Sequence, residues 1–453
     1  MREFTKAVLG FPWAMSLFGV EQLATMLTQN VSGSQDKATR AFDAVTQATI
    51  GRFGTVVQGL FQAGDELQRE VVDVLFSVLS PTGLVRLPSD MLQWSTQALR
   101  CFLPGEDSAL LWQELQNKVE VFVLVPGAST LLGLPSEPPF PPVQTGVERA
   151  YALEPYPIVW AVEGLGYWYG NTFWQRHETP HHILRSERVG DLPAKSLLML
   201  HAGIGLSFAR HYLQRVNHLS SVADIRQALE QIITLCLDNS RPGYEGAALE
   251  SLGLVTRSGT FTGDARPEVM VQIVGQQLAH FAPEVAGYFW HGVGRASYVL
   301  PINYVPCYGS FWHAFEMIRQ EVLDESAWLS ALAGLAWITA MTNIRQPAIV
   351  ANVLKYHGAR LAENDAFAYG MATSTVMRYD TAPDAPFIGP FYQYQPDPAQ
   401  PGLVQLWDSQ VSQPTREALH DYYPILKESG RLGEIFRYQS LPALVSQLKR
   451  ESR

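Results

Sequence analysis

Four polar side chains recur just ahead of a glycine in the middle of the sequence. They are Glu163, His201, Glu245 and His291, and each stands one or two positions before a Gly-x-Gly or Gly-x-Ala tripeptide. Two carboxylates and two imidazoles can ligate iron, manganese or zinc, or can act as an acid–base pair. If the tripeptides are equivalent, these side chains converge at one end of the core. We predict them as catalytic residues, with a structural hydrogen-bond network as the alternative.

Aromatic residues gather around two of the glycine tripeptides. Concave sites lined by aromatic rings bury apolar ligands well, with a few polar groups to orient them. We therefore predict an aromatic-lined cavity, whereas packing of the same rings in the core is the alternative. The predicted ligand-binding residues are Trp160, Tyr167, Trp168, Phe289, Trp290, Tyr298 and Trp312.

The segment from His177 to His181 matches the H-E-x-x-H pattern of zinc proteases. That chemistry needs both histidines on one face of a helix. Pro180 removes a helix hydrogen bond and disfavours helical geometry at the residue before it. The segment is therefore predicted to be a loop, which argues against a zincin. Ligation of a metal by His177, His181 and His182 in another geometry stays open.

The elements that must position these residues are predicted from six glycine tripeptides. Their first glycines are separated by 39, 43, 46, 42 and 36 residues. A period of about forty residues is typical of repeated helical hairpins. Residues 150–380 are thus predicted to form six hairpins, arranged as a curved solenoid or a closed α/α toroid. Helices are predicted over Ser196–Arg215, Val222–Leu237, Pro267–Phe281, Trp312–Val322 and Pro347–Leu361.

The flanking regions have a different character. Residues 1–118 show apolar residues at helical spacing and predict an amphipathic helical region. Residues 119–149 form a connection with one short strand at Glu120–Val125 and a proline-rich linker around residues 136–142. Residues 381–453 are rich in proline and aromatics. Pro386–Tyr394 there is expected to be irregular, with short helices at Thr415–Glu428 and Leu441–Lys449.

Two resemblances accompany this mainly α-helical prediction. Phe11–Gly19 and the long helix predicted after it resemble phasin-type granule-associated proteins, which implies an apolar helix face on a lipid or polyester surface. Gly205–Arg210, Tyr244–Ala248 and His291–Arg295 are similar to motifs of an uncharacterised bacterial family encoded near enediyne polyketide clusters. In that family an Asp-Gln pair tends to precede the Gly-x-Gly-Arg motif, where this chain has Trp290-His291. The second resemblance implies secondary metabolism and a polyene-like ligand.

Composition excludes several classes of function. The net charge is −10 with no basic cluster, so nucleic acid is not an expected partner. The sequence has no phosphate-binding loop, dinucleotide fingerprint or kinase motif set, so no nucleotide is expected either. Cys101, Cys236 and Cys307 lack metal-site spacing and fit buried thiols in a reducing compartment. We expect a cytoplasmic location, or a peripheral one at a membrane or granule.

These observations support three hypotheses. In the first, the protein binds, and in one version transforms, a hydrophobic polyene- or lipid-like molecule in the aromatic-lined cavity. In the second it is a non-catalytic structural protein that coats a lipid or polymer surface through its N-terminal helices. In the third it is a helical-repeat scaffold for protein partners. The sequence identifies neither a reaction nor a cofactor.

Overall fold

The computed structural model describes residues 107–185, 192–259, 266–300, 303 and 310–451. Helices account for the regular structure of this part of the chain, and none of its residues lies in a β-strand, so the prediction of a mainly α protein is confirmed. Residues 116–299 and 308–453 belong to one compact unit, whose architecture follows; the other comprises residues 1–115 and 300–307. The predictions for residues 1–106, including the amphipathic helices, lie outside the described residues.

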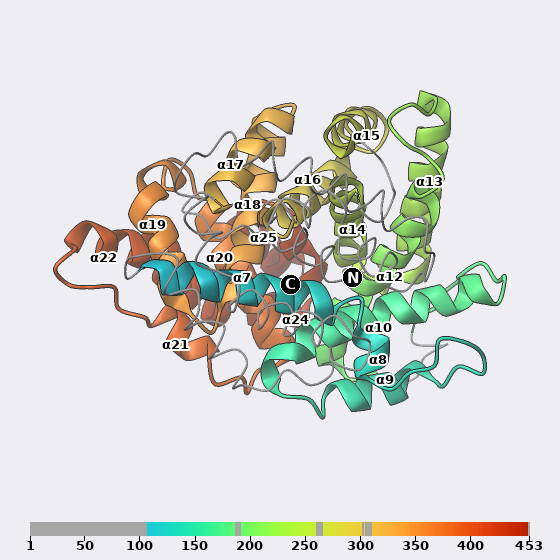
Figure 1. Cartoon of the computed structure of the whole chain (residues 1–453), viewed down its shortest axis with the longest axis horizontal. Helices are drawn as coiled ribbons and strands as arrows, with labels where there is room; N and C mark the ends of the chain where they lie inside the picture. The colour runs from blue at the N-terminus through green and yellow to red at the C-terminus, as the bar shows by residue number, and fades with distance from the viewer. Residues whose placement is uncertain (1–106, 186–191, 260–265, 301–302, 304–309, 452–453) are drawn as a thin grey trace, which may run out of the picture. The chain divides into compact units, whose positions relative to one another are not determined.

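Six helices of the compact unit pack on one another in chain order (Figure 1). Each contacts the next, and the last of them also contacts the first two. Each contains one of the six glycine tripeptides. They are α10 (Pro155–Gln175), α12 (Ala194–Leu213), α14 (Glu245–Ser258), α16 (Pro283–Tyr298), α18 (Glu325–Asn343) and α20 (Ala366–Thr381).

Four further helices alternate with these along the chain. They are α13 (Val222–Asn239), α15 (Pro267–Phe281), α17 (Ser310–Glu321) and α19 (Pro347–Leu361). Each of α13, α15 and α17 contacts both of the helices that it connects. Local residues fix where three of these helices begin. Ser221 caps the N-terminus of α13 by accepting a hydrogen bond from the backbone N–H of Asp224. The helices α15 and α19 begin at a proline, whose missing N–H costs nothing in a first turn. The predicted bounds of α15 and α19 are confirmed.

The glycines of the tripeptides lie where neighbouring helices touch backbone to backbone. A Cβ added to Gly203 would overlap the main-chain carbonyl of Glu163. At Gly292 it would overlap the carbonyl of Glu250, and at Gly334 that of His291. The absence of a side chain therefore permits these close crossings. The tripeptides thus mark the places where one helix backbone lies directly against the next.

Before α10 the structure differs from the predicted strand. Residues 120–124 lie in the last turn and a half of α7 (Asp107–Leu124), which is followed by α8 (Ala128–Leu131) and α9 (Val143–Ala150). Long-range contacts favour the helix over the strand propensity of its β-branched residues. Val121 is buried, Asn117 donates to Asn343 Oδ1 at 3.0 Å, and Glu120 pairs with Arg345 at 2.5 Å.

After α20 the chain continues in short helices. They are α21 (Ile388–Tyr392), α22 (Pro401–Trp407), the π-helix η2 (Asp408–Ser412), α23 (Gln413–Glu417), the π-helix η3 (Ala418–Tyr422), α24 (Tyr423–Glu428), the 3₁₀ helix η4 (Leu432–Phe436) and α25 (Leu441–Glu451). The expectation that residues 386–394 are wholly irregular is wrong. Pro390 is tolerated in α21 because it falls in the first turn, where backbone N–H groups lack partners inside the helix. The two predicted C-terminal helices are confirmed in outline.

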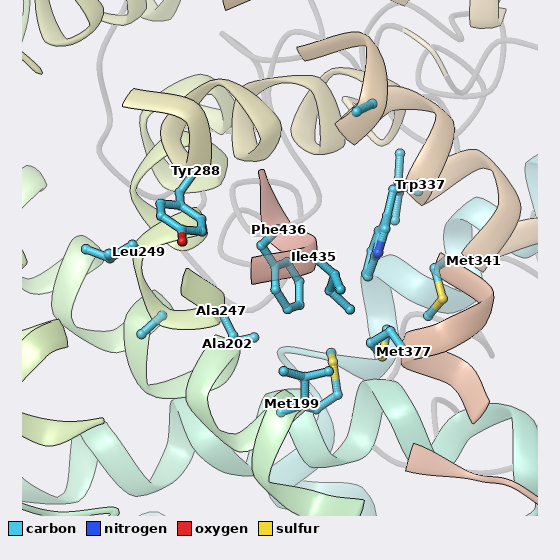
Figure 2. Close-up of a cluster of buried hydrophobic side chains, with 14 of the residues drawn as sticks. Met199, Ala202, Ala247, Leu249, Tyr288, Trp337, Met341, Met377, Ile435 and Phe436 are labelled. Carbon is cyan, nitrogen blue, oxygen red and sulfur yellow. The ribbon is translucent and has the colours of Figure 1, made fainter. Parts of the chain in front are cut away.

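The C-terminal segment also contributes to the core. Ile435 and Phe436 of η4 lie between Met199 on one side and Trp337 on the other (Figure 2). These side chains, together with Met341 and Met377, are fully buried or nearly so. They come from α12, α18, α20 and η4, so the region between the packed helices is filled with side chains from the end of the chain. In the described part of the chain, no helix has both the length and the apolar character to span a membrane.

Candidate functional site

A cluster of charged side chains is buried between α10, α14 and α16. Arg295 Nη2 donates to both oxygens of Glu163, at 2.5 and 2.7 Å, and Arg295 Nη1 donates to Glu250 Oε2 at 2.8 Å. The other oxygen of Glu250 lies 2.8 Å from His291 Nδ1. None of the four side chains is more than 5% exposed. The cluster thus joins residues separated by up to 132 positions in the chain.

The groups of this cluster shift one another's pKa values. Burial raises the pKa of Glu163, and the attraction of Arg295 opposes that rise without cancelling it. At Glu250 burial also acts to raise the pKa, but Arg295 and the hydrogen bond to His291 outweigh it and the pKa is lowered. The two carboxylates raise the pKa of Arg295 in spite of its burial. Arg295 therefore stays charged and holds Glu250 ionised.

The second ring nitrogen of His291 faces apolar surroundings. Because Glu250 accepts a hydrogen bond at Nδ1, that nitrogen carries the hydrogen, and among the described residues no partner lies within hydrogen-bond distance of Nε2. The rings of Trp337 and Phe436 stand edge-on to the imidazole, with centroids 6.1 and 6.0 Å away. The guanidinium of Arg295 lies over the Trp337 ring, 4.9 Å from its centroid. A buried ring nitrogen without a partner is a polar group held in a dry environment.

The structure brings two of the four predicted catalytic residues into one cluster. Glu163 and His291 both belong to it, linked through Arg295 and Glu250, which the sequence prediction missed. His201 lies elsewhere: its Nε2 accepts from the backbone N–H of Arg241 at 3.0 Å, and its Nδ1 is 2.6 Å from the carbonyl of Leu197. Glu245 accepts from the backbone N–H of Gly243 at 2.7 Å. A signal was available for Arg295, because it is the one arginine in α16 and the helix has no lysine.

The predicted ligand-binding aromatics are distributed through the packed unit. Trp160, Phe289 and Tyr298 are fully buried, Trp168 and Trp290 nearly so, and Tyr167 and Trp312 half-buried. Several make specific contacts there. Trp168 donates to the carbonyl of Pro135 at 2.9 Å, Tyr298 accepts from Asn343 at 2.8 Å, and Trp312 stacks on Phe315 with centroids 4.5 Å apart. Their role in ligand binding stays a prediction.

A cleft of about 260 Å³ opens between α13, α14, α16 and η4. Its walls combine apolar side chains with three carboxylates and one guanidinium. The lining residues are Ile233, Leu237, Gly243, Glu245, Gly246, Leu249, Glu284, Val285, Tyr288, Gly433, Glu434 and Arg437. Glu245 is the one predicted catalytic residue among them.

One carboxylate of the cleft is held by neighbouring cations. Glu434 pairs with Arg437 at 2.7 Å and with Arg431 at 2.8 Å, and it accepts from the hydroxyl of Tyr288 at 3.3 Å. Burial alone would raise the pKa of Glu434, but the charge of Arg437, the hydrogen bond from Gln439 and the charge of Arg431 outweigh it, and the pKa is lowered. Burial and the charge of Glu434 raise the pKa of Tyr288. Glu434 is therefore ionised and Tyr288 is neutral at physiological pH.

The cleft and the buried cluster share one wall. Glu434 lines the cleft, whereas Phe436, two residues further along η4, packs against the ring of His291. Figure 2 shows Tyr288 and Leu249 on one side of Phe436 and Trp337 on the other. A single short segment thus separates a solvent-accessible recess from the dry Nε2 of His291.

Comparison with known proteins adds no relative: no family model, curated protein or solved structure matches this chain.

Proposed function

We propose that this protein binds a small molecule with an apolar body and a positively charged group, in the cleft between α13, α14, α16 and η4. The lining of that cleft carries the proposal. Ile233, Leu249 and Val285 offer apolar surface, whereas Glu245 and Glu284 offer carboxylates. Recesses that combine apolar surface with polar groups that orient a ligand are typical of small-molecule sites.

Charge in the cleft favours a cation over an anion. Three carboxylates face one guanidinium among the lining residues, and Arg437 is already paired with Glu434. Glu245 and Glu284 then remain as partners for a ligand, Glu245 half-buried and Glu284 exposed. This proposal keeps the hydrophobic ligand that the sequence predicts and adds a positively charged group to it. It places the ligand in this cleft and not among the aromatic residues named from the sequence. The resemblance to proteins encoded near enediyne clusters is the reason to propose a biosynthetic context for that ligand.

The six packed helices support an α/α toroid as the architecture around this site. In a toroid the last inner helix returns to the first, and α20 contacts both α10 and α12. Arg378 of α20 donates to the carbonyl of Tyr156 in α10 at 2.7 Å. In an open solenoid the last helix, α20, would not contact the first, α10.

The proposal is tested with a matched pair of amphiphiles that share one chain. Octylamine and octanoate are titrated into the full-length protein by calorimetry, and native mass spectrometry of freshly purified protein checks for a retained ligand. Octylamine is expected to bind at one site and octanoate at least tenfold more weakly. Equal binding of the two would overturn the cationic preference.

Two variants test the location. Leu237 is 48% exposed at the cleft, so Leu237→Trp fills the recess without disturbing the core and should abolish binding of octylamine. Glu245→Gln should weaken it several-fold. Glu363→Gln, an exposed carboxylate away from the cleft, is the matched control and should leave binding unchanged. Unaltered affinity in Leu237→Trp would place the ligand elsewhere.

A further inference from the structure

Two histidines and one aspartate meet where the loop after α10 touches the last turn of α13. His181 Nδ1 lies 2.5 Å from Asp238 Oδ2, and His182 Nε2 lies 3.0 Å from Asp238 Oδ1. One atom from each residue falls within 4.8 Å of the others. We propose that His181, His182 and Asp238 form a binding site for a divalent transition-metal ion of the Zn²⁺ type.

The donor set suits that class of ion. Imidazole nitrogen and carboxylate oxygen are ordinary ligands of Zn²⁺, at about 2.0–2.2 Å, and ligands arranged tetrahedrally at such distances lie roughly 3.4 Å apart. The separations in the structure, from 2.5 to within 4.8 Å, bracket that value, so small side-chain rotations admit the ion. In the metal-free site a hydrogen lies between each facing ring nitrogen and the Asp238 carboxylate. A shift to the other tautomer moves that hydrogen to the far ring nitrogen and frees the facing nitrogen for a metal.

Hydrogen bonds between Asn239 and the main chain of the loop hold the loop in place on α13. The buried Asn239 accepts from the backbone N–H of Ile183 at 3.1 Å and donates to the carbonyl of Pro180 at 3.3 Å. Its own carbonyl accepts from the N–H of Leu184 at 3.3 Å. His182 has a φ of +52°, a region that non-glycine residues rarely adopt. These contacts orient both histidines toward Asp238 before any ion binds, which lowers the entropic cost of binding.

The site differs from a zinc-protease centre. The H-E-x-x-H segment begins after α10 has ended at Gln175, and His177 has a φ of +57°, so the segment is a loop, as Pro180 predicts. Only His181 of the two motif histidines joins the site, and the adjacent His182 and the distant Asp238 complete it. With the side chains of His181, His182 and Asp238 65%, 38% and 27% exposed, a fourth position stays open to water or a ligand from solvent. The ion would clamp the loop to α13.

The test uses Zn²⁺ alone as the probe. Full-length protein without an affinity tag is stripped with EDTA, returned to neutral pH and titrated by calorimetry, and its thermal unfolding is followed with and without Zn²⁺. One ion per chain is expected, with a rise in Tm that EDTA reverses. Tetrahedral Co²⁺ absorption bands from nitrogen and oxygen ligands should appear when Co²⁺ replaces Zn²⁺.

His182→Ala and Asp238→Asn should each weaken Zn²⁺ binding at least tenfold and remove the rise in Tm. His280→Ala, an exposed histidine on α15, is the matched control and should bind as the wild type does. Both ligand variants alter partly exposed side chains, and their Tm without Zn²⁺ reports whether they fold. Wild-type affinity in folded His182→Ala or Asp238→Asn, or no Zn²⁺ bound by the wild type, would overturn the proposal.

Discussion

At the scale of single residues, His201 is held in one neutral tautomer by two main-chain groups. The N–H of Arg241 requires an acceptor at Nε2, so the hydrogen of the ring lies on Nδ1 and is donated to the carbonyl of Leu197. Burial, and to a smaller extent the charge of Arg241, lower the pKa of His201 to about 4 against the opposing effect of the Leu197 hydrogen bond. A proton added at Nε2 would break the contact with Arg241.

The lowered pKa of His201 makes the free energy of unfolding depend on pH. The unfolded chain binds a proton at His201 below about pH 6.5, whereas the folded chain does so only near pH 4. The contribution of neutral His201 is thus complete above pH 6.5, and it is lost as the pH falls toward 4, by about 1.4 kcal/mol per pH unit. We expect the free energy of unfolding of the wild type, minus that of His201→Gln, to fall over this range in urea titrations.

Two features make the comparison specific. Glutamine can donate and accept at the same two places without titrating. The control is His280→Ala, which removes an exposed histidine and keeps His201, so the wild type minus this variant should show no fall of this kind. A difference between wild type and His201→Gln that stays constant from pH 7 to 4.5 would show that His201 does not titrate abnormally.

The buried charge cluster was predictable from the sequence only in part, and the reason concerns individual residues. The position of Glu163 and His291 ahead of a glycine predicts that they approach one another, and they share a cluster. Their direct partners, Glu250 and Arg295, depend on how far one helix is rotated and shifted against the next. A sequence records helical spacing within α14 and α16 but not the register between them.

At the scale of helices, the glycine tripeptides carried the most reliable information. Each falls in one of the six packed helices, and the glycines allow backbones to touch. The bounds of α15 and α19 followed from apolar periodicity and an N-terminal proline. The strand predicted at residues 120–125 failed because its propensity is weak and local, whereas the burial of Val121 and the Asn117–Asn343 hydrogen bond are long-range.

The close crossing of α16 and α18 can be tested with one methyl group. In Gly334→Ala the new Cβ would overlap the backbone carbonyl of His291, which cannot move unless α16 shifts. We expect the free energy of unfolding to fall by about 1–3 kcal/mol, measured by urea denaturation. Gly402→Ala is the matched control: it also lies in a helix, but the new Cβ has no neighbour within 4 Å, so stability should stay equal or rise by up to ~1 kcal/mol. Equal effects of both substitutions would contradict a tight crossing.

At the scale of the whole compact unit, the end of the chain completes the core made by its middle. The six packed helices follow one another along the chain, but Ile435 and Phe436 reach the core from about a hundred residues beyond α18. Apolar pattern alone does not predict this insertion, because η4 is only five residues long and shows no helical period. The same insertion separates the cleft from His291, so the cleft has its full set of walls only when the C-terminal segment is packed in place.

Removal of the Phe436 ring tests that dependence. Phe436 is fully buried against His291 and Trp337, so Phe436→Ala should lower the free energy of unfolding by about 3–5 kcal/mol. Tryptophan fluorescence in urea measures the loss, and trypsin should cleave after Arg437 faster because η4 is then held less tightly. Leu219→Ala, at a side chain 82% exposed, is the control and should change neither quantity. A fall of less than about 1 kcal/mol in the free energy of unfolding of Phe436→Ala would contradict this dependence. The core would then be stable without the packing of the C-terminal segment between the cleft and the charge cluster.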